Sequence, residues 1–136
     1  LQELFAQDRA GHVAKLLKPS LSKGKIVVSD RYFFSSFAYG SLDCELKWLF
    51  EINKSFPAPD LTFILKVRPE ICLARIKQRG KEIQLFEEEE KLHKVSETYT
   101  KLAEMFPNVY LIDGEADVKQ VFETIRQIVD NVISPL

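Results

Sequence analysis

The sequence lacks the features that mark nucleic-acid-binding and disulfide-bonded proteins. Nineteen basic residues nearly balance twenty acidic ones, so the formal net charge of −1 gives no overall positive field for nucleic acid or an anionic membrane. The two cysteines, Cys44 and Cys72, have no CxxC spacing, which argues against a zinc knuckle and a disulfide framework. The two histidines, His12 and His93, have no metal-ligand companions at a useful spacing. We therefore expect any anion binding to be local, and we assign the histidines no chemistry.

Long apolar runs are also absent. The longest apolar runs of the chain have only the length of a strand. The first residues, LQELFAQDRAGHV, are amphipathic, whereas a signal peptide begins with a basic stretch followed by an apolar one. The chain has no internal repeat, low-complexity tract or interdomain linker. Its 136 residues, 46% of them hydrophobic, are enough for one globular domain and too few for two comfortable ones. We therefore expect a single cytoplasmic domain over residues 1–136.

The hydrophobic patterns that are present alternate between strand and helix. Three short runs rich in β-branched residues predict strands buried on both faces, as in a parallel sheet, at 26–29, 61–67 and 109–112. An amphipathic first helix, closed by Pro19 and Gly24, precedes them. Helical spacing predicts further helices at about 43–54, 69–79, 87–104 and 117–132. This order predicts an α/β fold, a three-layer sandwich around a parallel sheet.

An acid and a base stand side by side where the first predicted strand ends, at Asp30 and Arg31. In open α/β sheets the ligand crevice lies at the carboxyl ends of the strands. A carboxylate there can hold a water of a bound magnesium ion, and a neighbouring guanidinium matches phosphate oxygens. The pair therefore favours phosphoryl chemistry. The alternative is that Asp30 caps the following helix and Arg31 is a solvated neighbour.

A series of motifs follows a fixed order along the chain. It consists of LFAQDRAGH, VVSDRYFFSSFAY, PAPDLTFILKVRPEICLARIKQRG, a Phe-Glu pair before a long helix, and VYLIDG. This series resembles the thymidylate kinases, and Asp30-Arg31-Tyr32 resembles the monophosphate kinases rather than the deoxynucleoside kinases. The resemblance implies the P-loop nucleotide-kinase fold, with three of the family's five strands present.

The resemblance implies a base-binding site in the first motif. Phe5 matches the residue that stacks on the thymine ring. Arg9, four residues on and on the same helix face, matches the arginine that hydrogen-bonds the base carbonyl O4. An arginine donor at this place favours thymine or uracil over cytosine, whose amino group would meet another donor. From the residues alone, Phe5 also fits the core of an amphipathic helix, and Arg9 fits a surface position.

The second motif implies the phosphate and sugar side of the same site. Arg31 matches the arginine that holds the 5′-phosphate of the acceptor, and Asp30 matches the carboxylate near magnesium. Ser35 and Ser36 occupy the turn close to the base. Tyr39 matches the aromatic residue under the sugar, which leaves little room for a 2′-hydroxyl; its alternative role is helix packing.

The segment 79–90 resembles the family's mobile lid. Arg75 and Arg79 are one helical turn apart, so closure could bring positive charge to phosphates in transfer, and we count Arg79 with Asp30 and Arg31 as catalytic. The alternative is a solvated charged face. The lid and ATP-side residues that the resemblance implies are Arg75, Arg79, Phe86, Asp113 and Gly114.

The motif GxxxxGK[ST], which cradles the phosphates of ATP in this class, does not occur in the 136 residues. We expect the chain to be the C-terminal part of a longer kinase. The resemblance implies transfer of the ATP γ-phosphoryl group to dTMP with Mg²⁺, and a homodimer that engages neither nucleic acid nor membrane. The alternatives are a UMP or other deoxynucleoside monophosphate kinase, or a kinase-like module that senses nucleotides or dimerises without catalysis.

Overall fold

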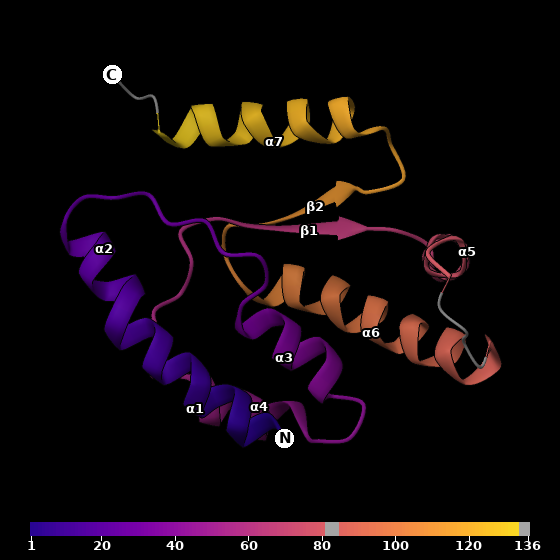
Figure 1. The fold of residues 1–136 in the computed structure, drawn as a ribbon, viewed down its shortest axis with the longest axis horizontal. Helices are drawn as coiled ribbons and strands as arrows, with labels where there is room; N and C mark the ends of the chain where they lie inside the picture. Colours follow the sequence, from indigo (N-terminus) through magenta and orange to yellow (C-terminus); the bar gives the residue numbers. More distant parts are fainter. Residues whose placement is uncertain (81–84, 134–136) are drawn as a thin grey trace. The chain divides into compact units, whose positions relative to one another are not determined.

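The computed structural model describes residues 1–80 and 85–133, without the side chains of residues 85–87. The chain forms two compact units, Leu1–Ala58 and Pro59–Leu136, and each is described by itself. The first unit is helical, and the second contains the sheet (Figure 1). Along these described stretches, no helix combines the length and apolar character needed to cross a bilayer. The expected single domain over residues 1–136 stays a prediction.

Helices make up the first unit. They are α1 (Gln2–His12), the π-helical turn η1 (Val13–Leu17), α2 (Lys18–Ser22), α3 (Phe33–Gly40) and α4 (Leu46–Asn53). The prediction that Pro19 closes the first helix is wrong, because the chain stays helical to Ser22. Proline is tolerated in the first turn of a helix, and Pro19 is the second residue of α2, which directly follows the π-helical turn η1. Gly24, with φ of 73°, follows the end of α2.

Aromatic side chains dominate the core of the first unit. The Phe37 ring stacks on Phe33 with centroids 5.2 Å apart and meets the edge of Phe50 at 4.7 Å. Burial of each such ring contributes about 1.5–3 kcal/mol. The chain turns from α3 towards α4 at Gly40, where a Cβ would lie 2.9 Å from a methyl carbon of Leu49. The buried apolar residues of this unit are Ala6, Val13, Leu17, Phe33, Phe34, Phe37, Ala38 and Leu49.

The predicted strand at 26–29 does not form. The segment belongs to no helix or strand, and two of its apolar residues, Ile26 and Val28, are 72% and 91% exposed. Residues of high β-propensity form a strand only beside a hydrogen-bonding neighbour, and the sheet of the described residues pairs β1 with β2 alone. The sequence pattern identified a suitable segment without showing what would pair with it.

The backbone turns sharply between this segment and α3. Arg31 has φ of 69°, a left-handed conformation that costs a non-glycine residue about 1–3 kcal/mol. The hydroxyl of Ser29 donates a 2.7 Å hydrogen bond to the carbonyl oxygen of Arg31 and helps to hold this turn. Tyr32 is the N-cap residue of α3, and no side-chain cap is present there. The alternative that Asp30 caps this helix is therefore wrong.

The second unit is an α/β layer structure. Its elements are β1 (Thr62–Lys66), α5 (Pro69–Gln78), α6 (Leu85–Met105), β2 (Val109–Asp113) and α7 (Val118–Ile133). The two strands are parallel, in register from Thr62 opposite Val109 to Lys66 opposite Asp113. α6 and α7 lie on opposite sides of the strands (Figure 1). The α/β class, the parallel sheet and the predicted helices of this unit are confirmed.

Burial of the two strands is less complete than predicted. Ile64 and Ile112 are buried, whereas Leu65 and Leu111 are 54% and 40% exposed. The register places Leu65 beside Ile112 and Ile64 beside Leu111, so each face of the sheet has one buried and one exposed residue. Each helix thus covers only part of its face of the two-stranded sheet that the described residues form.

The loop between β2 and α7 is tied closely to the end of β1. The amide of Gly114 donates a 2.9 Å hydrogen bond to the carbonyl oxygen of Lys66. The Glu115 carboxylate accepts hydrogen bonds from the backbone and side chain of Arg68, and the side-chain bond, followed by the backbone bond, lowers the pKa of Glu115. Asp117 accepts from the amide of Gln120 and caps α7. These bonds hold the two strand ends side by side.

Gly114→Ala and Gly11→Ala are expected to change stability in opposite directions. A Cβ at Gly114 would lie 2.6 Å from a methyl carbon of Val67 and 3.1 Å from the Leu65 Cβ, so the loop must shift. We expect a loss of about 1–3 kcal/mol, as for overpacking elsewhere. Gly11 lies within α1 with nothing within 4 Å of its Cβ position, so alanine there should stabilise by about 0.5–1 kcal/mol. Urea unfolding followed by far-UV circular dichroism measures both, and a neutral Gly114→Ala would contradict the close approach.

Candidate functional site

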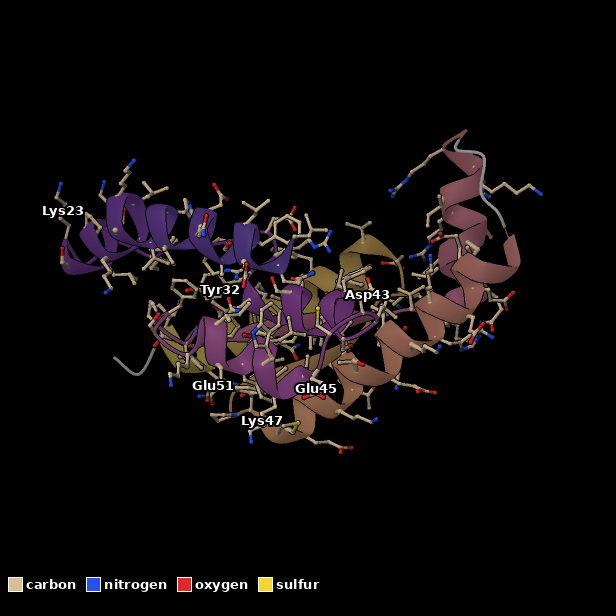
Figure 2. All side chains as sticks on the ribbon, turned by 90° about the horizontal axis from the view of Figure 1, so that it is seen from below. Lys23, Tyr32, Asp43, Glu45, Lys47 and Glu51 are labelled. Carbon is tan, nitrogen blue, oxygen red and sulfur yellow. The ribbon has the colours of Figure 1, made fainter. Side chains whose placement is uncertain are left out.

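Arg9 connects three helices of the first unit. It projects from α1 and donates hydrogen bonds from Nη2 to the Ser36 hydroxyl on α3, at 2.8 Å, and from Nη1 to the Asn53 amide oxygen on α4, at 2.5 Å. Its guanidinium carbon lies 5.5 Å from the ring centre of Tyr32 and 5.8 Å from that of Phe56. Tyr32 lies next to the first helix (Figure 2) and donates its hydroxyl proton to the Pro57 carbonyl at 3.1 Å. The guanidinium is thus fixed in one orientation.

Arg9 has no ion-pair partner among the described residues. Burial is the main cause of the lowered pKa of Arg9, while Tyr32 and Asp8 oppose it. Burial likewise raises the pKa of the Tyr32 phenol. A partly buried cation is stabilised by any further oxygen that it can bind. Ser36 and Asn53 take two of the five guanidinium N–H groups, so among the described residues three are left that could donate to a ligand carbonyl.

Asn53 is a site residue that the sequence analysis missed. Its side chain is 2% exposed, accepts from Arg9 and donates to the Leu49 carbonyl at 2.9 Å. It is 44 residues from Arg9 and occupies the last position of α4. The sequence signal was one amide at the end of an amphipathic helix, and that signal does not name a partner.

A second arginine, Arg31, is hydrogen-bonded to Ser35, the residue of α3 next to Ser36. Arg31 donates from Nε to the Ser35 hydroxyl at 3.0 Å, and its guanidinium carbon lies 5.1 Å from the centre of the Tyr39 ring. This bond uses Nε, so the two terminal nitrogens keep the planar fork that suits a phosphate. Ser35 and Ser36 therefore each orient one arginine, and Tyr39 supports Arg31 from below.

Phe5 and Asp30 complete the predicted acceptor residues. Phe5 lies one helical turn before Arg9 on α1 and is 48% exposed, so its ring is accessible to a flat ligand. Asp30 precedes the strained Arg31 and is exposed. All seven residues of the two motifs thus belong to the first unit, and hydrogen bonds or ring contacts join Arg9 with Ser36 and Arg31 with Ser35 and Tyr39.

The predicted lid and ATP-side residues belong to the second unit. Arg75 donates from Nη1 to the Gly114 carbonyl at 3.1 Å, so α5 is tied to the loop after β2. The Asp113 side chain accepts from the amide of Glu115 at 2.9 Å. Arg79 is the exposed C-cap residue of α5 and precedes Gly80, whose φ is 77°. The structure does not describe residues 81–84 or the side chain of Phe86. The roles of the lid and of Arg79 therefore stay predictions.

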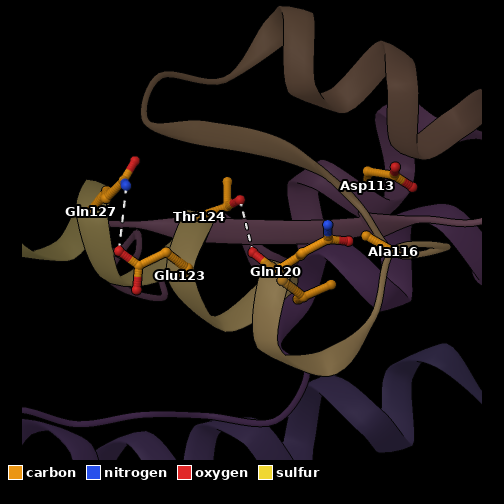
Figure 3. Close-up of a pocket in the computed structure, with 7 residues that line it drawn as sticks. Asp113, Ala116, Gln120, Glu123, Thr124 and Gln127 are labelled. Atoms are coloured by element: carbon orange, nitrogen blue, oxygen red, sulfur yellow. Dashed lines mark hydrogen bonds between the residues drawn. The ribbon is translucent and has the colours of Figure 1, made fainter.

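An open hollow of about 450 Å³ lies between the β2–α7 loop and α7 (Figure 3). Its wall includes two carboxylates, Asp113 and Glu123, together with Gln120, Thr124 and Gln127. Glu123 accepts from Gln127 and forms an ion pair with Arg126. Carboxylates repel phosphate, so this hollow does not suit the phosphate groups of a nucleotide.

Comparisons with known proteins agree with the motif series. The family model described as thymidylate kinase matches residues 1–125. A "Probable thymidylate kinase" of Thermococcus kodakarensis is 41% identical over 131 residues, covering 96% of this chain and 64% of that protein. One of Pyrococcus horikoshii is 40% identical over 127 residues, covering 93% and 62%. The chain thus spans less than two thirds of the length of these relatives.

A more distant relative matches over the same stretch. A "Probable thymidylate kinase" of Methanococcoides burtonii is 33% identical over 138 aligned positions, covering 96% of this chain and 68% of that protein. The family model matches far more than half of the chain, and the stretch that it covers holds every predicted acceptor residue. The chain therefore belongs to the thymidylate kinase family.

Proposed function

We propose that the protein acts as a dTMP kinase, which transfers the γ-phosphoryl group of ATP to the 5′-phosphate of dTMP and gives dTDP. The observation that carries this proposal is Arg9, a partly buried cation that Ser36 and Asn53 orient and that has no carboxylate partner in the described part of the chain. Membership of the thymidylate kinase family supports the same reading.

Recognition of the base rests on Phe5 and Arg9. The exposed Phe5 ring would stack on thymine, and the remaining N–H groups of Arg9 would donate to the base carbonyl O4. Cytosine presents an amino group at that position, so its N–H groups would face those of Arg9, and the guanidinium would lack a hydrogen-bond acceptor. Tyr39 would lie under the deoxyribose.

Phosphoryl transfer rests on orientation and charge. Arg31, fixed by Ser35 and Tyr39, would bind the 5′-phosphate of the acceptor and hold its attacking oxygen in line. Asp30 is an exposed carboxylate beside this arginine, which fits a magnesium ion bound through one carboxylate, waters and substrate phosphates. That ion, when bound, supplies positive charge to the phosphates. Arg79 would add charge from the lid-like segment 79–90.

The finer features of this activity are part of the proposal. They are ATP as the donor, Mg²⁺ as the metal, Arg75, Asp113 and Gly114 beside the ATP, a homodimer, and a cytoplasmic location. Because the 136 residues contain no GxxxxGK[ST] motif, the sharpest tests on this chain measure binding of the acceptor rather than turnover.

The chain is expected to bind dTMP at least tenfold more tightly than dCMP and UMP. The discrimination against dCMP comes from the Arg9 donor, and that against UMP from the ring of Tyr39 beneath the sugar. Isothermal titration calorimetry with the three nucleotides measures it. Equal affinity for dTMP and UMP would favour a kinase of neighbouring specificity, and absence of any nucleotide binding would contradict an acceptor site formed by these residues.

Arg9→Ala and Asn53→Leu are expected to weaken dTMP binding through one shared contact. Loss of a hydrogen bond from a charged group costs about 1.5–3 kcal/mol, so Arg9→Ala should raise Kd by about 10- to 100-fold. Asn53→Leu should have a smaller effect of about 3- to 10-fold, since it frees the guanidinium without removing it.

A double-mutant cycle separates this role from a general loss of structure. If Asn53 acts by orienting Arg9, Asn53→Leu should cost no further affinity in the Arg9→Ala background. Lys54→Ala is the matched control, because Lys54 follows Asn53, is exposed and pairs only with Glu51 among the described residues. Additive effects of the two substitutions would contradict the positioning role.

Two replacements of Arg31 should lose phosphate binding equally and differ in stability. Arg31→Ala and Arg31→Gly both remove the guanidinium, so both should weaken dTMP binding at least tenfold while leaving thymidine binding unchanged. Glycine accepts φ of 69° without strain, so Arg31→Gly should be about 1 kcal/mol more stable than Arg31→Ala. Calorimetry and urea unfolding check the two parts, and an equal loss of thymidine affinity would contradict the phosphate assignment.

A further inference from the structure

Three side chains that can bind metals converge between α5 and α6. Glu89 and His93 are four residues apart on α6, which places them on one face of that helix. Glu70 reaches the same place from the first turn of α5. The ligand atoms of these three residues all lie within 4.8 Å of one another. Neither Glu89 nor Glu70 has any role in the proposed nucleotide chemistry.

The distances suit one small cation. The His93 Nε2 atom lies 3.4 Å from a Glu70 carboxylate oxygen and 3.9 Å from a Glu89 carboxylate oxygen. Ligands of a tetrahedral zinc ion, with bonds of about 2.0–2.2 Å, lie about 3.3–3.6 Å apart. All three side chains are 40–57% exposed, so small rotations can close the remaining gap without disturbing the core.

The local charge favours a cation as well. The neighbouring glutamates of α6 have lysine partners one turn away, Glu88 with Lys91 and Glu90 with Lys94. Glu89 differs, because its ion-pair partner among the described residues is His93 alone, and the same holds for Glu70. Arg68 faces Glu70 at longer range. Two carboxylates thus share one imidazole, which leaves negative charge uncompensated.

We infer that Glu70, Glu89 and His93 form a site for a divalent transition-metal ion such as Zn²⁺ or Co²⁺, with water in the fourth position. A ligand set of one imidazole nitrogen and two carboxylate oxygens suits these ions, whereas Mg²⁺ prefers oxygen ligands only. This site is separate from the magnesium proposed beside Asp30, and it does not depend on the proposed kinase activity.

The bound ion would join the two helices at a definite place. Glu70 lies in the first turn of α5, whereas Glu89 and His93 lie in the first half of α6, so the metal closes a loop that contains the rest of α5 and the connection to α6. Cross-linking of this kind stabilises the two helices against separating. The site therefore offers a means by which a transition metal could hold together α5 and α6, and one of its ligands, Glu89, lies within the lid-like segment 79–90.

The test is titration of the 136-residue chain with CoCl₂ and with ZnCl₂, in a Cys44→Ser, Cys72→Ser background that removes the thiols as competing ligands. We expect one saturable Zn²⁺ site per chain that excess Mg²⁺ does not displace, and a Co²⁺ absorption band typical of low coordination number. His93→Ala and Glu70→Gln should each weaken Zn²⁺ binding at least tenfold. Glu70→His should tighten Ni²⁺ binding at least tenfold, because it adds a second imidazole.

Matched controls distinguish this site from other metal-binding groups. His12→Ala removes the only other histidine, and Glu90→Gln alters a neighbouring glutamate that already pairs with Lys94; neither should change the affinity. Far-UV circular dichroism confirms that each variant is folded. Zn²⁺ affinity that is the same in the background chain and in His93→Ala, or that falls as much with His12→Ala, would overturn the site, as would a Glu70→His variant with unchanged Ni²⁺ affinity.

Discussion

The arrangement of the first unit depends on one guanidinium. Arg9 binds Ser36 on α3 and Asn53 on α4 while projecting from α1, so a single planar group fixes the mutual orientation of three helices. The same group is the proposed reader of the base. Structure and recognition are therefore coupled, because each N–H that orients Arg9 also determines the direction in which its remaining donors point.

Two adjacent serines of α3 each bind one of the two arginines of the proposed acceptor site. Ser36 accepts from Arg9 and Ser35 from Arg31, and consecutive positions on a helix point in directions about 100° apart. One turn of α3 thus orients both arginines, and in the proposed function one of them would face the base and the other the phosphate. The left-handed backbone of Arg31 is part of this arrangement, since it allows α3 to begin immediately after the extended segment. Strain at this residue coincides with the position that the proposed mechanism needs most.

In the second unit, short hydrogen bonds between loops position the strand ends. The Gly114 amide, the Arg68–Glu115 bonds and the Arg75 bond to the Gly114 carbonyl gather the ends of β1 and β2 and the helix α5 around one loop. Glu70 of the same α5 lies with its carboxylate 3.4 Å from Nε2 of His93 on α6. The helix α5 is thus bonded to the β2–α7 loop through the side chain of Arg75, and its Glu70 faces α6.

The sequence by itself determined the local elements and the family. Hydrophobic periodicity located β1, β2 and the later helices, and the motif series identified the family and the residues of the proposed acceptor site, because both signals are contained in short stretches of chain. The tertiary structure decided everything that needs a distant partner. It showed that 26–29 forms no strand within the described part of the chain, that a π-helical turn precedes Pro19 while the chain stays helical, and that Asn53 contacts Arg9 across 44 residues. It also brought Glu70 to His93, a contact that the packing of α5 against α6 creates, whereas Glu89 is only four residues from His93 in the sequence. Contacts of this kind depend on how elements pack, which no local pattern specifies.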